Sequence, residues 1–196
     1  MEKYLNSLKK NVASSIQNKE NFLKNETELR NFAEVVSVIV KAYKNGGRLL
    51  IAGNGGSAAD SQHLAAEFVS KLARPRNPLP AEALTTDTSA LTAIGNDYGY
   101  EYVFSRQIEG KARPEDVFLG ITTSGRSANI LQAFKTCHQM KIPCVLLGGK
   151  GGGPAKELAD YSIVVPGEET SHIQELHMTV YHTLCGCVED ELCFSA

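Results

Sequence analysis

Residues 48–63 read RLLIAGNGGSAADSQH, an apolar run that passes into a glycine-rich turn. This pattern predicts a buried strand that breaks at Gly53, Gly55 and Gly56 and turns into a helix at Ser57. Such a junction places free backbone N–H groups and the positive end of a helix dipole at the carboxyl edge of a sheet. An anion such as phosphate binds well there, so the stretch predicts both an α/β fold and an anion site.

Four further short apolar runs follow, and each is separated from the next by a helical segment. Strands are expected at 48–52, 81–84, 117–122, 143–147 and 161–165. Helices are expected near 57–73, 101–111, 127–141 and 153–159. Strands that alternate with helices predict an α/β protein, a three-layer αβα sandwich around a five-stranded parallel sheet.

Two amphipathic helices are expected before the first strand, at 3–23 and 27–45, and one long helix at 170–194. The proline-rich stretch 74–80 is too short to separate domains. The prediction is therefore a single domain over 1–196, with an N-terminal helical segment (1–45) and an α/β core (46–196) that ends in the long helix.

Composition narrows the class of protein. The 196 residues carry a net charge of −2, which argues against a nucleic-acid partner bound through a broad basic face. No apolar run is long enough to span a membrane, and the first residues lack the pattern of a signal peptide. The five cysteines form no C-x-x-C pair, and free thiols in a reducing cytoplasm are expected.

A second loop of the anion-binding type follows the third expected strand, where residues 122–127 read TTSGRS. Hydroxyls at Thr122, Thr123, Ser124 and Ser127 can donate several hydrogen bonds to a phosphate. Ser127 also stands where a helix cap is expected, so capping and a polar turn explain this loop equally well when it is taken alone. Two such loops at one sheet edge favour a ligand site.

Groups that can move protons or bind metal lie close to the first loop in sequence. His63 and Glu67 are four residues apart on one helix, a spacing that suits metal ligation and equally suits a surface ion pair. On the last helix Gln174, Met178 and His182 follow at successive steps of four. The remaining histidines, at 138, 172 and 177, are interpreted as structural, and Asn96-Asp97 as a polar turn.

Four segments together resemble one known family: AGNGGSAADSQHLAAEF (52–68), LTTDTSALTAIGNDYGYEYVFSRQ (84–107), TTSGRSANI (122–130) and IQELHMTVYH (173–182). They are similar to the phosphoheptose isomerases of the sugar isomerase (SIS) fold, and the resemblance covers residues 4–194. It implies conversion of D-sedoheptulose 7-phosphate to D-glycero-D-manno-heptose 7-phosphate, the entry step of bacterial heptose synthesis. It also implies a cytoplasmic homotetramer with active sites at subunit interfaces.

The resemblance assigns roles by position. Glu67 and His182 match the acid–base pair, and zinc would be bound by His63, Glu67, Gln174 and His182. The positions implied to contact substrate are Asn54, Gly55, Gly56, Ser57, Glu67, Asn96, Asp97, Thr122, Thr123, Ser124, Ser127 and Gln174. Two departures, Thr122 where serine is usual and Arg126 after Gly125, retain both the hydroxyl and the loop.

The implied chemistry is aldose–ketose isomerisation through an enediol, with Glu67 as the base and His182 as the acid. Zinc would polarise the carbonyl, and Glu67 can hardly be a tight ligand and a free base at once. A rival from another class is a non-catalytic SIS protein that binds a replication initiator; such relatives lack the acid–histidine pair. A sugar-phosphate-sensing regulator would need a DNA-binding domain, for which no residues remain.

Assembly can also be predicted from the helices. A sheet of this size needs about four covering helices, which the segments between the strands supply. The helices at 3–23, 27–45 and 170–194 are therefore expected to bury their apolar stripes between subunits, in a homotetramer.

Overall fold

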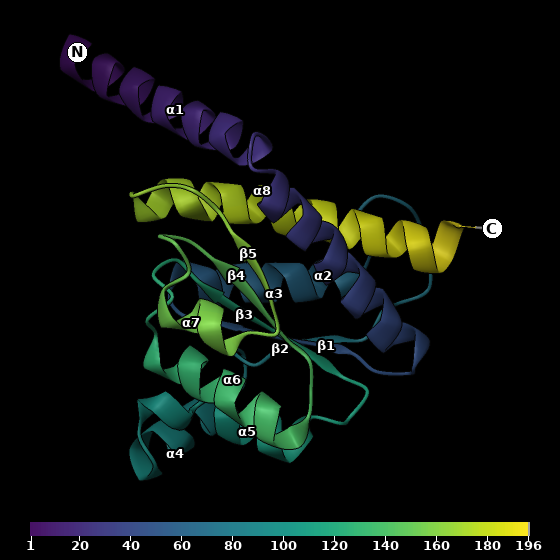
Figure 1. The fold of residues 1–196 in the computed structure, drawn as a ribbon. Coiled ribbons are helices and arrows are strands. Elements are labelled where there is room, and N and C mark those ends of the chain that lie inside the picture. The colour runs from purple at the N-terminus through teal and green to yellow at the C-terminus, as the bar shows by residue number, and fades with distance from the viewer. Residues whose placement is uncertain (196) are drawn as a thin grey trace.

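The five expected strands form one parallel sheet in the computed structural model, which describes residues 1–195 (Figure 1). The order across the sheet is β2-β1-β3-β4-β5, so β1 and β3 lie side by side near its centre. Chain order reverses beside β1, which opens a crevice at the carboxyl ends of these strands. The strands are β1 (Leu49–Gly53), β2 (Ala81–Ala83), β3 (Val117–Thr122), β4 (Cys144–Gly148) and β5 (Tyr161–Val164).

Alternate residues of each strand pack into two separate cores, as the period of a strand requires. In β1, Leu49 and Ile51 belong to one core and Leu50 and Ala52 to the other, and all four are buried. The first core is covered by α2 (Glu26–Lys44), α3 (Gly56–Val69) and α8 (Thr170–Glu189), and the second by α5 (Ser105–Lys111), α6 (Ala128–Met140) and α7 (Gly153–Leu158). Figure 1 shows these two helical layers on opposite faces of the sheet. The predicted αβα sandwich is confirmed.

The expected role of α2 and α8 was wrong. Val35 and Ile39 of α2, and Leu176 and Val180 of α8, are buried against the sheet of their own chain. These helices close one face of the sheet, which α3 alone could not cover.

The α1 helix (Glu2–Leu23) projects away from the sandwich (Figure 1), and it carries an exposed apolar stripe. Its exposed apolar side chains are Tyr4, Leu5, Leu8, Val12 and Ile16.

Three local features also differ from expectation. A helix that was not predicted, α4 (Thr88–Asp97), precedes a short 3₁₀ turn at Tyr100–Tyr102, so Asn96 and Asp97 end a helix and do not form a turn. The α3 helix stops at Val69, earlier than expected. The last helix ends at Glu189 and continues as a π-helical turn, Asp190–Phe194. Within residues 1–195, no helix is long and apolar enough to cross a bilayer.

Candidate active site

The first loop turns sharply at Gly55, where the backbone has a φ of 55° before α3 begins. Glycine adopts this conformation without strain, which lets the chain leave β1 and enter the helix within three residues. At the next position, a Cβ atom on Gly56 would lie 2.2 Å from Nε2 of Gln174, so a larger residue here would displace the Gln174 side chain of α8. The loop and α8 are therefore in contact at the carboxyl edge of the sheet.

The second loop is held by its own hydroxyls. Thr122 Oγ1 accepts a hydrogen bond from the backbone N–H of Gly125 at 3.2 Å and lies 3.2 Å from Ser127 Oγ. Ser127 stands at the N-cap of α6 as predicted, yet its side chain makes no capping hydrogen bond. Because that hydroxyl is not used for capping, it can serve a ligand.

The two loops and the start of α8 enclose a pocket of about 220 Å³. Its position, at the carboxyl ends of β1 and β3 and the N-terminal ends of α3 and α6, is where an open α/β sheet binds anions. It is lined by Asn54, Gly56, Ser57, Ile121, Thr122, Thr123, Ser124, Ser127, Thr170 and Gln174. Most of the predicted contact residues thus meet in one place. Ile121 and Thr170 were missed, and nothing in the sequence marked them.

A reciprocal pair of amides joins the two loops. Asn54 donates to Oδ1 of Asn129 at 2.9 Å, and Asn129 donates to Oδ1 of Asn54 at 2.8 Å. The hydroxyl of Tyr100 also donates to Asn54 Oδ1, at 3.2 Å. Asn129 is buried at the start of α6 and was not predicted as a site residue. It fixes the first loop to the helix that carries the second.

The acid and imidazole groups meet between α3 and α8. His63 Nε2 lies 3.1 Å from Glu67 Oε1 and 3.4 Å from His182 Nε2. These atoms of His63, Glu67 and His182 all lie within 4.8 Å of one another. The predicted i, i+4 pair therefore faces His182 of α8. The side chain of Glu67 is 21 % exposed and that of His63 is 42 % exposed, so a ligand can reach both.

The cluster fits a zinc ion. Zinc–nitrogen and zinc–oxygen bonds of about 2.0–2.2 Å in a tetrahedron keep ligand atoms roughly 3.3–3.6 Å apart. The separations of 3.1 and 3.4 Å are close to this range, and two imidazoles with one carboxylate are common zinc ligands. Gln174, the fourth expected ligand, lies two helical turns before His182 and lines the anion pocket.

Behind His63 lies a chain of hydrogen bonds that was not predicted. The hydroxyl of Tyr181 lies 3.1 Å from His63 Nδ1 and donates to Asp60 Oδ1 at 3.4 Å. Burial raises the pKa of Asp60, and it also raises the pKa of Tyr181. When Tyr181 donates to Asp60, its oxygen accepts from Nδ1–H of His63 and leaves Nε2 unprotonated. The neutral ring then presents a lone pair toward Glu67 and His182, as a metal ligand requires.

A buried ion pair ties together the two helices that carry the cluster. Arg76 and Glu189 lie 2.6 Å apart with almost no exposure. The same guanidinium donates to the carbonyl oxygens of Glu67 and Phe68, each at 2.8 Å. Arg76 therefore caps the end of α3 and binds the end of α8, which fixes the separation of Glu67 from His182.

Not every predicted contact reaches these places. Asn96 and Asp97 lie exposed at the end of α4, where the amide of Asn96 donates to Asp97. The α4 helix has no buried residue. Nearby, the guanidinium of Arg106 lies 3.8 Å from the ring centre of Tyr98.

Comparison with known proteins bears on this arrangement. A family model described as SIS domain matches residues 11–149. Phosphoheptose isomerase 2 of Campylobacter jejuni is 49% identical over 192 residues, which are 98% of this chain and 96% of the relative. The chain belongs to the phosphoheptose isomerase family.

Other members of the family agree in sequence and in structure. The phosphoheptose isomerase of Aneurinibacillus thermoaerophilus is 49% identical and covers 94% of this chain and 93% of its own length. The structure of a phosphoheptose isomerase from Neisseria gonorrhoeae superposes with a TM-score of 0.89 at 38% identity, over 95% of this chain and 99% of that one. The phosphoheptose isomerase structure from Francisella tularensis gives a TM-score of 0.90 at 33% identity, over 95% and 98% of the two chains. The resemblance and the fold predicted from the sequence are both confirmed.

Proposed function

We propose that this protein converts D-sedoheptulose 7-phosphate to D-glycero-D-manno-heptose 7-phosphate, the first step toward bacterial heptose precursors of lipopolysaccharide core or capsule. The observation that carries the proposal is the placing of an anion pocket and an acid–base cluster along one helix. From Gly56 at the pocket to His63 at the cluster, α3 rises about 10 Å. An extended sugar phosphate, with its phosphate and carbonyl at opposite ends, suits such a separation.

The residues of the chain account for each proton that moves. Glu67 removes a proton from C1, next to the C2 carbonyl, and the electron pair forms the C1–C2 double bond of an enediol. O2 is protonated as the enediol forms. The enediol then loses the hydroxyl proton on O1, C2 receives a proton, and an aldehyde is left at C1. His182, 3.4 Å from His63, is the group that we assign to the hydroxyl protons.

We assign a zinc ion to His63, Glu67, Gln174 and His182. When bound, it supplies a Lewis acid that polarises the sugar carbonyl. Since Glu67 is both a proposed ligand and the proposed base, solvent-proton exchange by metal-free and zinc-loaded enzyme separates the two roles. If Glu67 acts as a base free of metal, the metal-free protein will still exchange the C1 protons of the ketose.

The proposal includes a cytoplasmic homotetramer with active sites between subunits. Two features support it: the exposed apolar stripe of α1, and the α4 helix, none of whose residues is fully buried in its own chain. A second chain packed on either helix would bury these surfaces in a closed symmetric contact. The five free cysteines, three of them buried, suit a reducing compartment.

The alternative, a non-catalytic protein that binds a replication initiator, has no observation in its favour. Such relatives are expected to lack the acid and histidine pair, and here Glu67 and His182 are present and face one cluster.

The test is incubation of the purified protein with sedoheptulose 7-phosphate in heavy water. We expect the aldose product to carry deuterium at C2. Glu67→Gln and His182→Asn should each lower turnover by at least about 100-fold, because each removes a proton-transfer group at nearly constant shape. As a matched control, Ser127→Ala should mainly raise KM, by roughly tenfold for one lost hydrogen bond. Full turnover in the Glu67 variant, or no exchange in a folded zinc-loaded protein, would contradict the proposal.

A further inference from the structure

A second group of potential metal ligands lies at the opposite, amino edge of the sheet. It consists of His138 on α6, Cys144 at the first residue of β4 and Asp160 just before β5. His138 Nε2 lies 3.4 Å from Asp160 Oδ1, and Cys144 Sγ lies 3.3 Å from Asp160 Oδ2. One donor atom from each residue can be chosen so that all three lie within 4.8 Å of one another. The three donors come from three different elements and converge on one point.

The donor types and spacings match one kind of cation. Tetrahedral zinc, with bonds of about 2.0 Å to nitrogen or oxygen and 2.3 Å to sulfur, separates its ligand atoms by roughly 3.3–3.8 Å. Cys144 Sγ lies 3.3 Å from Asp160 Oδ2 and His138 Nε2 lies 3.4 Å from Asp160 Oδ1, so each donor is at this spacing from one of the two carboxylate oxygens. A thiolate ligand favours zinc over magnesium or calcium, which prefer all-oxygen sites.

The carboxylate is already oriented by the backbone. Asp160 Oδ2 accepts the N–H of Cys144 at 2.9 Å, and the N–H of Asp160 donates to the carbonyl of Cys144 at 3.0 Å. This double contact fixes both residues and leaves Asp160 Oδ1 toward His138. Carboxylates that bind metals are commonly oriented in this way by additional hydrogen bonds.

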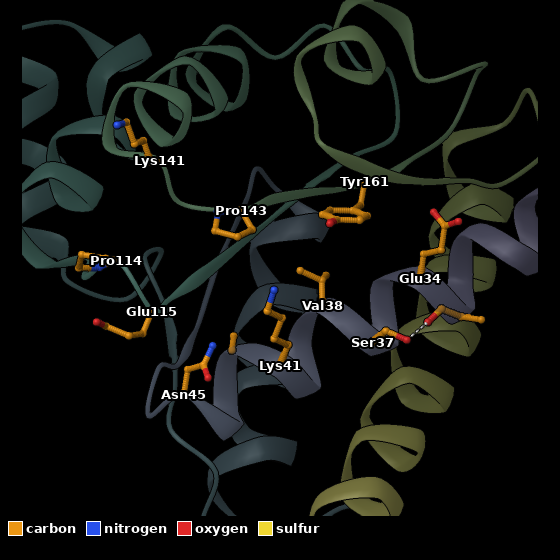
Figure 2. Close-up of a pocket in the computed structure, with 12 residues that line it drawn as sticks. Glu34, Ser37, Val38, Lys41, Asn45, Pro114, Glu115, Lys141, Pro143 and Tyr161 are labelled. Carbon is orange, nitrogen blue, oxygen red and sulfur yellow. Dashed lines mark hydrogen bonds between the residues drawn. The ribbon is translucent and has the colours of Figure 1, made fainter.

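Solvent reaches the group from one side. The side chains of His138 and Asp160 are 45% and 42% exposed and line a cavity of about 550 Å³. Cys144 is buried beneath them. A neighbouring cavity of about 610 Å³ shares Lys141, Pro143 and Tyr161 with it, and Figure 2 shows these three residues at its wall. Water can therefore serve as a fourth ligand on the open side.

We propose that His138, Cys144 and Asp160 form a second cation site, suited to Zn²⁺ and separate from the cluster of His63, Glu67 and His182. The cluster of His63, Glu67 and His182 lies between α3 and α8, which cover one face of the sheet, whereas His138 belongs to α6, which covers the other face. A cation held here joins the end of α6 to the starts of β4 and β5. Its role is structural, because it stabilises the folded state that binds it.

Cobalt distinguishes the two sites by their ligands. The active-site cluster offers only nitrogen and oxygen, whereas the second site offers sulfur. Titration of metal-free, full-length protein with Co²⁺ should therefore give two equivalents per chain, of which one produces a thiolate-to-cobalt charge-transfer absorption. Cys144→Ser should abolish that absorption and reduce the bound cobalt by one equivalent per chain. Its isomerase turnover should be retained when the active site holds metal. His182→Asn should keep the absorption, and so should Cys137→Ser, a buried neighbouring thiol.

A second variant, at the exposed residue His138, tests the proposal even if Cys144→Ser does not fold. His138→Gln leaves the buried thiol in place and should weaken the cobalt affinity measured by the charge-transfer absorption by about tenfold or more. Absence of the absorption in the native protein would overturn the proposal. So would its survival in Cys144→Ser, since another cysteine would then be the ligand, or an unchanged affinity in His138→Gln.

Discussion

The amide pair between Asn54 and Asn129 offers a sharp test of how the anion pocket is held in shape. Asn129→Ala removes two hydrogen bonds, of 2.8 and 2.9 Å, from a side chain that is 3% exposed. At about 1 kcal/mol for each bond, and with a small cavity left behind, the free energy of unfolding should fall by roughly 2–3 kcal/mol. Asn54 would keep only the Tyr100 hydroxyl as a partner and would no longer be fixed to α6.

Urea unfolding and steady-state kinetics measure the two consequences separately. Because Asn54 lines the pocket, release of its loop should raise KM for the sugar phosphate, and a loss of 1–2 kcal/mol in binding corresponds to roughly 5- to 30-fold. Turnover at saturation should change much less, since Glu67 and His182 are held by α3 and α8. Gln132→Ala, one turn further along α6, is the matched control and should leave both quantities nearly unchanged.

A double-mutant cycle decides whether the pair acts as a unit. We expect Asn54→Ala, Asn129→Ala and the double variant to show a coupling of about 1–2 kcal/mol in unfolding free energy. Strict additivity of the two single variants would refute the reasoning, because it would mean that neither side chain stabilises the other.

Further predictions follow from other parts of the chain. Burial lowers the pKa of His177 to about 4, so the unfolded state binds a proton that the folded state refuses. Between pH 6.5 and pH 4 the free energy of unfolding should therefore fall by about 3 kcal/mol. Urea titrations at both pH values should show a smaller fall for His177→Gln. Gly125→Ala would place a Cβ 1.8 Å from the carbonyl oxygen of Gly152 at a φ of 64°, and inorganic phosphate should then bind at least about tenfold more weakly. Gly110→Ala, with open space around it, is the control by isothermal titration. Leu8→Glu, on the exposed stripe of α1, should shift sedimentation from tetramer toward smaller species, whereas Lys10→Glu on the same helix should not.

Much of the pocket could be predicted because its signals are local. The glycines around Asn54 and the hydroxyls of 122–127 are short patterns that specify their own backbone geometry, and the structure places both at one sheet edge. The face of the sheet that a helix covers is a different matter. An apolar stripe shows that a helix buries one side but not in which chain, and for this reason the sequence wrongly predicts subunit contacts for α2 and α8.

Contacts between residues far apart in sequence left no local signal. Asn54 and Asn129 are 75 residues apart, and Asp60 and Tyr181 are 121 apart. A lone asparagine at a helix start is usually interpreted as part of the turn, and a tyrosine on an apolar helix face as core. Their partners became evident only when the sheet had brought the elements together.

The placing of Gln174, Tyr181 and His182 on α8 has a consequence for biosynthesis. All the strands and both anion-binding loops precede Thr170, so a nascent chain can assemble the sheet before this helix leaves the ribosome. Until α8 docks, the face of the sheet that it shares with α2 and α3 remains partly uncovered, and Glu67 lacks its partner His182. Any premature stop codon before residue 170 should therefore yield a product without isomerase turnover. Its exposed apolar surface should also make that product susceptible to proteolysis.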